Sequence, residues 1–239
     1  MNRKNLFDNI LLTIGITSYS RPKELKRCLE SIDLISNHRF EVIVSDDFSP
    51  NREEIVKVVD EFNKSSFFDV QLILNCENLG FDLNLRSLMK VANGKYLLFI
   101  TDDDSFYKNG LGSLYRLILA QKPKVLLCPF VEGDTVYRLL NDTPSGIASI
   151  SGYMIYQSIL ISGIVVETDS VREINLDGLE RVIYSQVYFS MMMIEKYGLL
   201  GMDTPLIKCN SDGENGFGKV ESTGFTPLLA DRQHYLSNL

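Results

Sequence analysis

Residues 96–107, YLLFITDDDSFY, place a run of apolar side chains directly before three consecutive aspartates. The apolar part has the length and composition of a buried strand, so Asp102, Asp103 and Asp104 stand where that strand ends. Neighbouring carboxylates repel one another, and a divalent metal ion beside them would reduce that repulsion. On this interpretation the run should be poorly settled without the metal. The alternative is a solvated turn in which one aspartate caps the helix that begins near Lys108.

Similar apolar runs alternate with amphipathic helices through the first half of the chain. Continuous apolar strands separated by helices favour an α/β fold with a mainly parallel sheet and helices on both faces. Ligands bind beyond the carboxyl ends of the strands in such sheets, and polar residues gather there. We expect strands over residues 9–17, 41–47, 70–75, 95–101 and 125–131. We expect a helix after each of the first four strands, the third ended by Gly94 and the fourth over 111–121.

The second half of the chain is less regular. Its patterns predict loops over 133–150, a helix over 151–160, a strand over 163–167, a helix over 177–197 and a mobile glycine-rich loop over 210–218.

Bulk properties narrow the class of protein. The chain has 239 residues, 45% of them apolar, and a net charge of −7, which argues against a nucleic-acid partner. Its four cysteines form no C-x-x-C pair, which disfavours structural zinc and fits a reducing cytoplasm. No stretch is long and apolar enough to span a bilayer, and the N-terminal residues resemble a first strand more than a signal peptide.

Polar residues after the strands suggest a nucleotide site. Carboxylates suit Mg²⁺ or Mn²⁺, Tyr19 offers a ring to a base, and Arg21 offers a cation to phosphate. The pair Asp46 and Asp47 can accept hydrogen bonds from a base or ribose; alternatively, Asp47 or the nearby Ser49 caps the next helix. The phosphate-binding patterns G-x-x-x-x-G-K-[ST] and, after a strand, G-x-G-x-x-G are missing.

Four motifs in order resemble the family 2 glycosyltransferases, whose fold is called GT-A. They are TSYSRP (17–22), EVIVSDDFS (41–49), NLGFDLNLRSLMKVANGKY (78–96) and LLFITDDD (97–104), and the resemblance covers residues 10 to 107. It implies a mainly parallel central sheet flanked by helices. Residues 1–132 would form a Rossmann-like half that binds the nucleotide-sugar, and residues 133–239 would form the acceptor-binding half of the same domain.

The resemblance also implies roles for individual residues. The donor would be held by Thr17, Tyr19, Arg21, Asp47, Asn78, Asn84 and Asp102, although asparagines near turns are often caps. Mn²⁺ or Mg²⁺ would be held by Asp103, Asp104 and His234, although a single histidine near a chain end is often simply exposed. Counting back from the next helix makes Asp103 the main ligand, whereas a literal D-x-D pattern selects Asp102 and Asp104.

The implied reaction is inverting transfer of a sugar from a nucleotide-sugar, expected to be a UDP-sugar, to a hydroxyl of a glycan or lipid-linked glycan in surface polysaccharide synthesis. The family's base lies near the start of a helix in the second half, where this chain has Ser185 and Gln186. Asp177 and Glu180 are the nearest carboxylates and are our candidates for the base; alternatively, both merely favour the positive end of the helix.

Two other classes of protein are considered. The first is a catalytically inactive nucleotide-sugar-binding protein, suggested by Ser185 and Gln186. The second is a response-regulator-like signalling module, which would have about half this length. We expect a location in the cytoplasm and leave attachment to the inner face of the membrane, and the oligomeric state, open.

Overall fold

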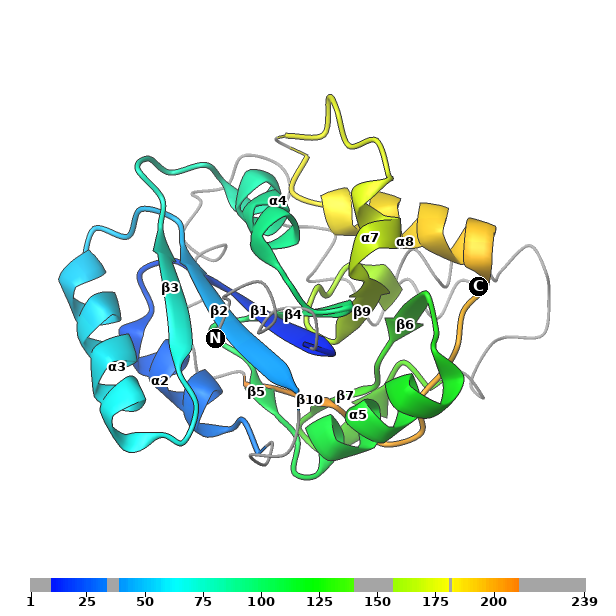
Figure 1. The fold of residues 1–239 in the computed structure, drawn as a ribbon, viewed down its shortest axis with the longest axis horizontal. Helices are drawn as coiled ribbons and strands as arrows, with labels where there is room; N and C mark the ends of the chain where they lie inside the picture. Colours follow the sequence, from blue (N-terminus) through cyan, green and yellow to red (C-terminus); the bar gives the residue numbers. More distant parts are fainter. Residues whose placement is uncertain (1–9, 34–38, 140–156, 181, 211–239) are drawn as a thin grey trace, which may run out of the picture.

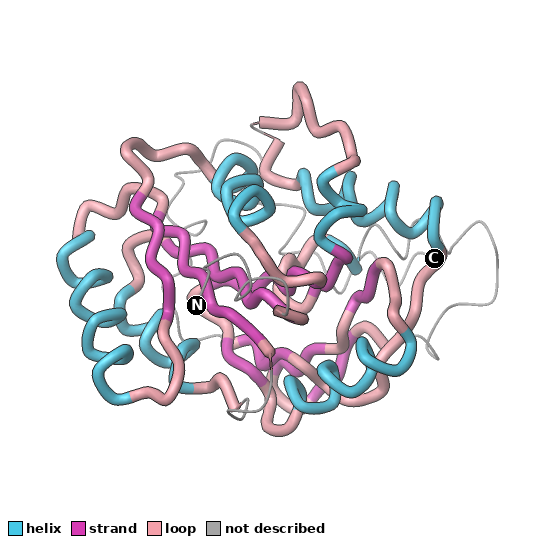
Figure 2. Tube along the Cα trace, viewed as in Figure 1, coloured by secondary structure: helices cyan, strands magenta, loops and turns pink. Residues whose placement is uncertain are grey.

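The computed structural model describes residues 10–33, 39–139, 157–180 and 182–210. Its central sheet has the strand order β3-β2-β1-β4-β9-β6 (Figure 2). Strands β1 (Leu12–Ser18), β2 (Phe40–Asp46), β3 (Val70–Leu74) and β4 (Tyr96–Thr101) are mutually parallel. Strand β9 (Ile164–Glu167) runs antiparallel to β4 and to β6 (Val125–Leu127). The mainly parallel sheet predicted from the apolar runs is confirmed.

Helices cover both faces of this sheet (Figure 1). One layer contains α2 (Pro22–Glu30), α3 (Arg52–Ser65) and α5 (Gly110–Gln121), and the other contains α4 (Phe81–Val91), α7 (Thr168–Arg172) and α8 (Ser185–Tyr197). Alternation along β4 shows how the sheet supports both layers. Leu98 packs into the core beneath α2, α3 and α5, whereas Leu97 and Phe99 pack into the core beneath α4 and α8. Because successive strand side chains point to opposite faces, a strand covered on both sides is apolar throughout.

A second, smaller sheet has the order β5-β10-β7-β8. Its strands are β5 (Ser105–Phe106), β7 (Phe130–Glu132), β8 (Thr135–Tyr137) and β10 (Ile207–Cys209). The single strand predicted over 125–131 is therefore wrong: the chain changes sheets at Pro129, which has no amide proton for a strand ladder. The loop predicted over 133–150 is wrong where β8 forms. The three aspartates lie at the junction of the two sheets, between β4 and β5.

Two helix predictions need correction. The helix predicted over 177–197 begins at Ser185, because the preceding residues include Gly178 (φ +80°) and Ile183 (φ +65°), conformations that no α-helix contains. Gly94 does not end α4, which stops at Val91. It lies so close to β1 that an added Cβ atom would be 2.4 Å from the Thr13 amide nitrogen.

Several predictions fall outside the described ranges. His234, most of the helix predicted over 151–160 and nearly all of the glycine-rich loop over 210–218 lie there. The proposed division after residue 132 is not tested, although β9, from the second part, lies between β4 and β6 of the first. Within the described ranges, no helix combines the length and apolar character needed to cross a membrane.

Candidate active site

The carboxyl ends of β2, β1 and β4 lie next to one another at one edge of the central sheet. The Asp102 amide donates to the Thr17 carbonyl oxygen (3.0 Å), and the Asp47 amide donates to the Ser18 carbonyl oxygen (3.0 Å). These backbone bonds extend the parallel ladder just past the strands. The edge therefore brings together polar residues from three separate segments, as the sequence pattern predicts for a ligand site.

Arg21 links two of the three aspartates. Its Nη1 atom lies 3.0 Å from Oδ1 of Asp102 and 2.7 Å from Oδ2 of Asp103. The other oxygen of Asp102 accepts a hydrogen bond from the Tyr19 amide (3.1 Å). In this structure the guanidinium group of Arg21 therefore pairs with two carboxylates of the acidic run.

Two of the three aspartates in the acidic run are buried. Asp102 is 2% exposed and Asp104 is 6% exposed, and α5 has Asn109 at its cap position with no side-chain capping bond. The backbone carbonyl of Asp103 also accepts hydrogen bonds from Arg27 (2.9 Å) and Asn210 (3.1 Å). The solvated-turn alternative is therefore wrong, and the expectation that the segment is poorly settled without metal stays a prediction.

Burial dominates the acidity of these carboxyl groups. It raises the pKa of Asp102 to about 7, helped by the negative charge of Asp103 and opposed by Arg21. Burial likewise raises the pKa of Asp104 to about 6, against the lowering effect of its hydrogen bonds with Ser162 and Thr101. In the absence of a further cation, the site thus holds protons near neutral pH that an exposed aspartate would have lost.

The donor set fits a divalent cation held by few protein ligands. Oxygen atoms of Asp102 and Asp103 already converge on a single nitrogen of Arg21. Mg²⁺ is typically bound through one or two carboxylates together with substrate phosphates and water. Asp104 instead accepts a hydrogen bond from the Thr101 hydroxyl (3.3 Å), and no group of three or more metal-binding side chains occurs among the residues placed in the structure. The geometry thus favours Asp102 and Asp103 over the other pairings.

Other predicted donor residues bind the chain itself. The Asp47 carboxylate accepts hydrogen bonds from the amides of Leu79 (2.8 Å) and Gly80 (2.9 Å), so it fixes the loop before α4. Asn84 is 3% exposed and its side chain donates to the Ser45 carbonyl oxygen (3.1 Å). Asn78 is exposed, and its side-chain oxygen accepts a hydrogen bond from the nearby Gly80 amide (3.0 Å).

The alternative in which Asp47 or Ser49 caps the helix after β2 is wrong. Helix α3 has Asn51 at its cap position, with no side-chain capping bond. Asp46 is fully buried and accepts from the Ser49 amide (3.2 Å) and from Arg52 (3.3 Å). Asp46 closes the turn after β2 rather than starting a helix.

The two carboxylates proposed as the base lie in the loop before α8. Asp177 is exposed and lines a cavity of about 570 Å³ between α4 and α7. Glu180 pairs with Arg86 of α4 (3.3 Å) and accepts from the Gly178 amide (3.0 Å). No described contact joins either residue to the Arg21–Asp103 pair, so the base assignment stays a prediction.

Asp82, which the sequence reasoning missed, sets the start of α8. It is 1% exposed, and its carboxylate accepts from the amides of Ile183 (2.7 Å) and Ser185 (3.0 Å). Gln186 is buried there, and its side chain donates to the Ile159 carbonyl oxygen (2.8 Å). An aspartate in the first turn of a helix is ordinarily assigned to its own helix, so only the tertiary structure reveals this role.

Arg27 and Asn210 were also missed. Arg27 is one of many basic residues on amphipathic helices, and Asn210 lies 107 positions from Asp103 in the sequence. Neither has a local signal that would have identified it.

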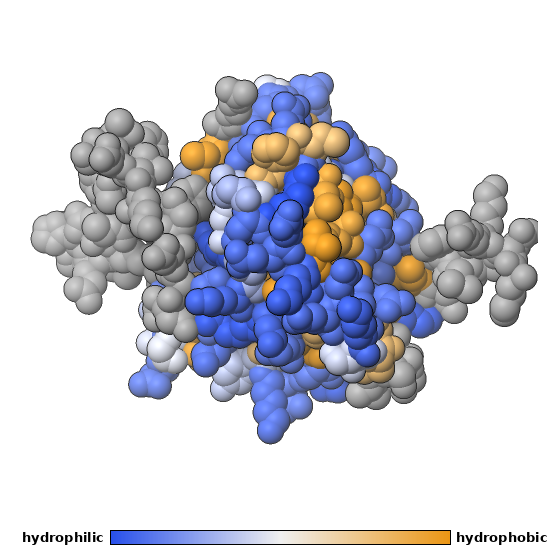
Figure 3. All heavy atoms as spheres, turned by 90° about the vertical axis from the view of Figure 1, so that its left-hand side faces the viewer, coloured by the Kyte–Doolittle hydropathy of each residue, from blue (hydrophilic) through white to orange (hydrophobic). Residues whose placement is uncertain are grey.

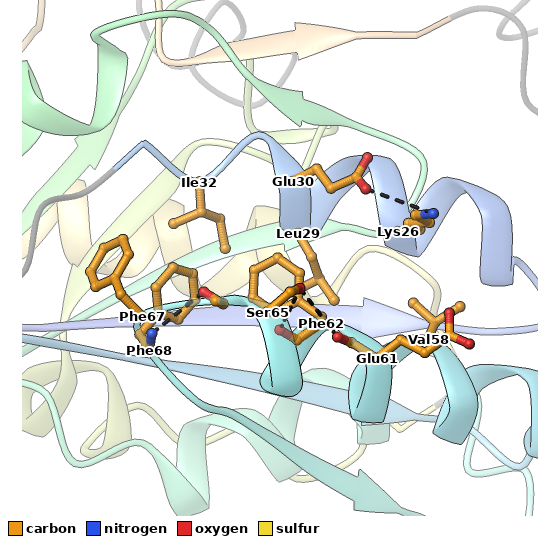
Figure 4. A pocket seen from close by; sticks show the side chains of 11 residues that line it. Lys26, Leu29, Glu30, Ile32, Val58, Glu61, Phe62, Ser65, Phe67 and Phe68 are labelled. Carbon is orange, nitrogen blue, oxygen red and sulfur yellow. Dashed lines mark hydrogen bonds and ion pairs between the residues drawn. The ribbon is translucent and has the colours of Figure 1, made fainter.

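A cavity of about 380 Å³ lies between α2 and α3, away from the candidate site (Figure 4). Its lining includes Leu29, Phe62 and Phe67, at the end of the helices nearest the amino ends of the strands. This side of the molecule is mainly hydrophilic with a hydrophobic strip (Figure 3). No residue of the Arg21–aspartate cluster lines this cavity.

Comparisons with known proteins agree with this geometry. The profile of glycosyl transferase family 2 matches residues 13–159. An uncharacterized glycosyltransferase of Haemophilus influenzae is 33% identical over 115 residues, 48% of this chain and 36% of that protein. The abequosyltransferase RfbV of Salmonella typhimurium is 24% identical over 233 residues, 86% of this chain and 68% of that protein.

Solved structures share the fold at low identity. The S. aureus TarS 1–349 complex with UDP-GlcNAc has a TM-score of 0.67 and 15% identity, covering 89% of this chain and 62% of that chain. A mannosyltransferase of Pyrobaculum calidifontis in complex with GDP-Man and Mn²⁺ has a TM-score of 0.60 and 12% identity, covering 86% of this chain and 58% of that chain. This chain thus spans about a third of the first relative and about three fifths of these two structures.

The profile match covers more than half of the chain and includes every strand end that builds the carboxylate edge. The ordered motifs, the parallel sheet and the site at its carboxyl edge all belong to that matched region. The chain is therefore a member of glycosyl transferase family 2.

Proposed function

We propose that this protein is an inverting glycosyltransferase that moves a sugar from a UDP-sugar to a hydroxyl of a glycan or lipid-linked glycan. The observation that carries the proposal is the convergence of Asp102 and Asp103 on Arg21 at the carboxyl edge of a parallel sheet. The UDP-GlcNAc bound by TarS and the sugar transfer stated in the name of the relative abequosyltransferase RfbV support it. We place the reaction in surface polysaccharide synthesis, in the cytoplasm or at the inner face of the membrane.

Each residue at the edge has a chemical task in this proposal. Asp102, fixed by the Tyr19 amide, is positioned to accept hydrogen bonds from ribose hydroxyls. Asp102 and Asp103 would hold Mn²⁺ or Mg²⁺, as suggested by the Mn²⁺ in the Pyrobaculum mannosyltransferase complex. When bound, the metal would offset negative charge on the departing diphosphate. Arg21, released from the aspartates, would bind the same phosphates.

We propose different tasks for the two parts of the chain. Residues 1–132 supply the three strand ends of the donor site, and residues 133–239 would supply the acceptor side. The base that takes the acceptor proton would be Asp177 or Glu180. If either serves, Asp177→Asn or Glu180→Gln should lower kcat by about 100-fold or more without weakening UDP binding.

The decisive experiment measures UDP affinity by isothermal titration calorimetry with and without Mn²⁺. Asp103→Ala should abolish transfer and remove the effect of Mn²⁺ on UDP binding. Asp69→Ala is the matched control, because Asp69 is exposed just before β3, at the opposite edge of the sheet. A wild-type affinity for UDP that is the same with and without Mn²⁺ would refute the metal assignment. A thermal-shift screen of nucleotide-sugars with Mn²⁺ should identify the donor, since a bound ligand stabilises the native state.

A second candidate is a nucleotide-sugar-binding protein without transferase activity. The observation in its favour is the start of α8, where Ser185 and Gln186, both buried, occupy the region in which the family's base is expected. Transfer assays with candidate acceptors separate the two. Donor binding without transfer to any acceptor, and without donor hydrolysis, would favour this alternative.

A further inference from the structure

Phe48 combines two features that packing does not explain. Its side chain is 47% exposed, and its backbone φ of +62° lies in the left-handed region. A bulky residue is strained there, because its Cβ crowds the neighbouring carbonyl group. Exposure of an apolar ring and backbone strain both oppose stability, and such outliers concentrate at functional sites.

Hydrogen bonds on both sides hold the Phe48 turn in this conformation. The Ser49 amide donates to Oδ2 of Asp46 (3.2 Å), and the Ser49 hydroxyl donates to the other oxygen of that carboxylate. The Ser49 hydroxyl also accepts from the Ser20 amide (2.7 Å), which joins the turn after β2 to the turn after β1. Since Asp46 is fully buried, the strained turn cannot relax without breaking buried bonds.

Arg52 supports one face of the Phe48 ring. Its guanidinium carbon lies 4.9 Å from the ring centroid. The same guanidinium group bonds to Asp46 through Nε (3.3 Å) and to the Asn75 carbonyl oxygen. An aromatic ring has two faces, so a ring backed by a fixed cation presents its second face to a planar ligand.

The position of Phe48 matches one end of a nucleotide. Phe48 follows β2, Tyr19 follows β1, and the aspartates follow β4, in the order of the strands across the sheet. Tyr19 is 45% exposed, and its amide binds Asp102. A nucleoside diphosphate laid along this edge, with its phosphates at Asp103, has its base on the side of β1 and β2.

We propose that Phe48 provides a stacking surface for the nucleobase of the donor. The inference rests on the proposed function and adds to it the residue that contacts the base. Stacking between a base and an aromatic side chain is favourable for every base, since each has a π face. The strained turn holds the Phe48 ring at the carboxyl end of β2. A glycine or another small residue at this position would have no ring to stack on a base.

The test separates the ring from the backbone conformation. Asparagine adopts the left-handed region more readily than phenylalanine, so Phe48→Asn should raise the melting temperature by about 2 °C. The same variant should weaken UDP binding about tenfold and leave pyrophosphate binding unchanged. Phe48→Tyr, which keeps a ring, should match the wild type for both ligands. Phe67→Asn is the control, because Phe67 is 59% exposed and lines the distant cavity between α2 and α3.

The outcomes distinguish this inference from the proposed function. If the wild type binds UDP and Phe48→Asn binds it equally well, the inference is overturned and the proposed function stands. Equal losses of UDP and pyrophosphate affinity would assign Phe48 to support of the turn and also overturn it. If the wild type binds none of UDP, GDP, CDP and dTDP, the proposed function fails and the inference falls with it.

Discussion

Substitution of Asp102 by asparagine should reduce the pH dependence of folding stability. The pKa of Asp102 rises from 3.8 to about 7 in the folded protein, mainly because of burial. Between those values the folded state binds a proton that the unfolded chain has lost. The folded state then has the greater number of bound protons, so the free energy of unfolding falls as the pH rises through this window. This direction is the reverse of that for an ordinary salt-bridged aspartate.

The size of the effect follows from the same values. Each pKa unit corresponds to about 1.4 kcal/mol, so Asp102 accounts for a loss of about 4 kcal/mol between acidic and mildly alkaline pH. That is a large part of the 5–15 kcal/mol typical of a domain. Asparagine has nearly the same shape and no proton to lose. Asp104 has a pKa of about 6 and affects the free energy of unfolding in the same direction. Because Asp104 remains in the variant, the dependence of this free energy on pH should become weaker without disappearing.

The assay is urea denaturation at pH 5 and pH 8 with EDTA present, for the wild type, Asp102→Asn and the control Asp60→Asn. Asp60 is an exposed residue of α3. Because pH 5 to pH 8 covers only part of the span from 3.8 to about 7, the wild type should lose about 2.6 kcal/mol more than Asp102→Asn between the two pH values, and the control should behave as the wild type. An equal loss in the wild type and Asp102→Asn would show that Asp102 is ionised throughout, and the argument from burial would be wrong.

Three further outcomes test other parts of the structure. Asp82→Ala should lower the free energy of unfolding by about 2–4 kcal/mol in urea denaturation, because two amides before α8 lose a charged acceptor; a change below about 0.5 kcal/mol would refute the contact. Gly94→Ala should destabilise by at least about 2 kcal/mol because its Cβ meets the backbone of β1, whereas Gly112→Ala, whose Cβ has room, should not. Arg21→Met should raise the pKa of Asp102 further, measured by carbon NMR of the carboxyl groups; an unchanged value would show that the ion pair does not form in solution.

Continuous apolar runs explain why most of the central sheet could be predicted from the sequence. Strands β1, β2 and β4 are buried over most of their length, so their residues are mainly apolar and polar residues mark their carboxyl ends. Helices α2, α3 and α4 follow with apolar residues on one face. These are local signals, and each was read within a few residues of its true bounds.

Features that depend on distant contacts could not be predicted. The run over 125–131 is uniformly apolar, and nothing local shows that it leaves one sheet and enters another at Pro129. The strand at 164–167 was expected, but its antiparallel place between β4 and β6 is a matter of topology. The periodic apolar residues that predicted this helix begin well before Ser185, where α8 starts. The contact that sets this start comes from Asp82, about 100 positions earlier in the sequence.

Motif spacing located the candidate site but did not show which carboxylate has which role. Asp47 and Asp82 each accept hydrogen bonds from two backbone amides, which fix the loop before α4 and the start of α8. Asp102 and Asp103 are also joined by a side chain, that of Arg21, which is 18% exposed and can rotate away without a change in the backbone. Asp102 and Asp103 would hold a divalent cation between them, and Arg21, released from both, would pair with the diphosphate. Such an exchange would leave no buried charge unpaired, and this is the physical reason for proposing metal and phosphate roles for Asp102, Asp103 and Arg21 rather than for the equally acidic end of β2.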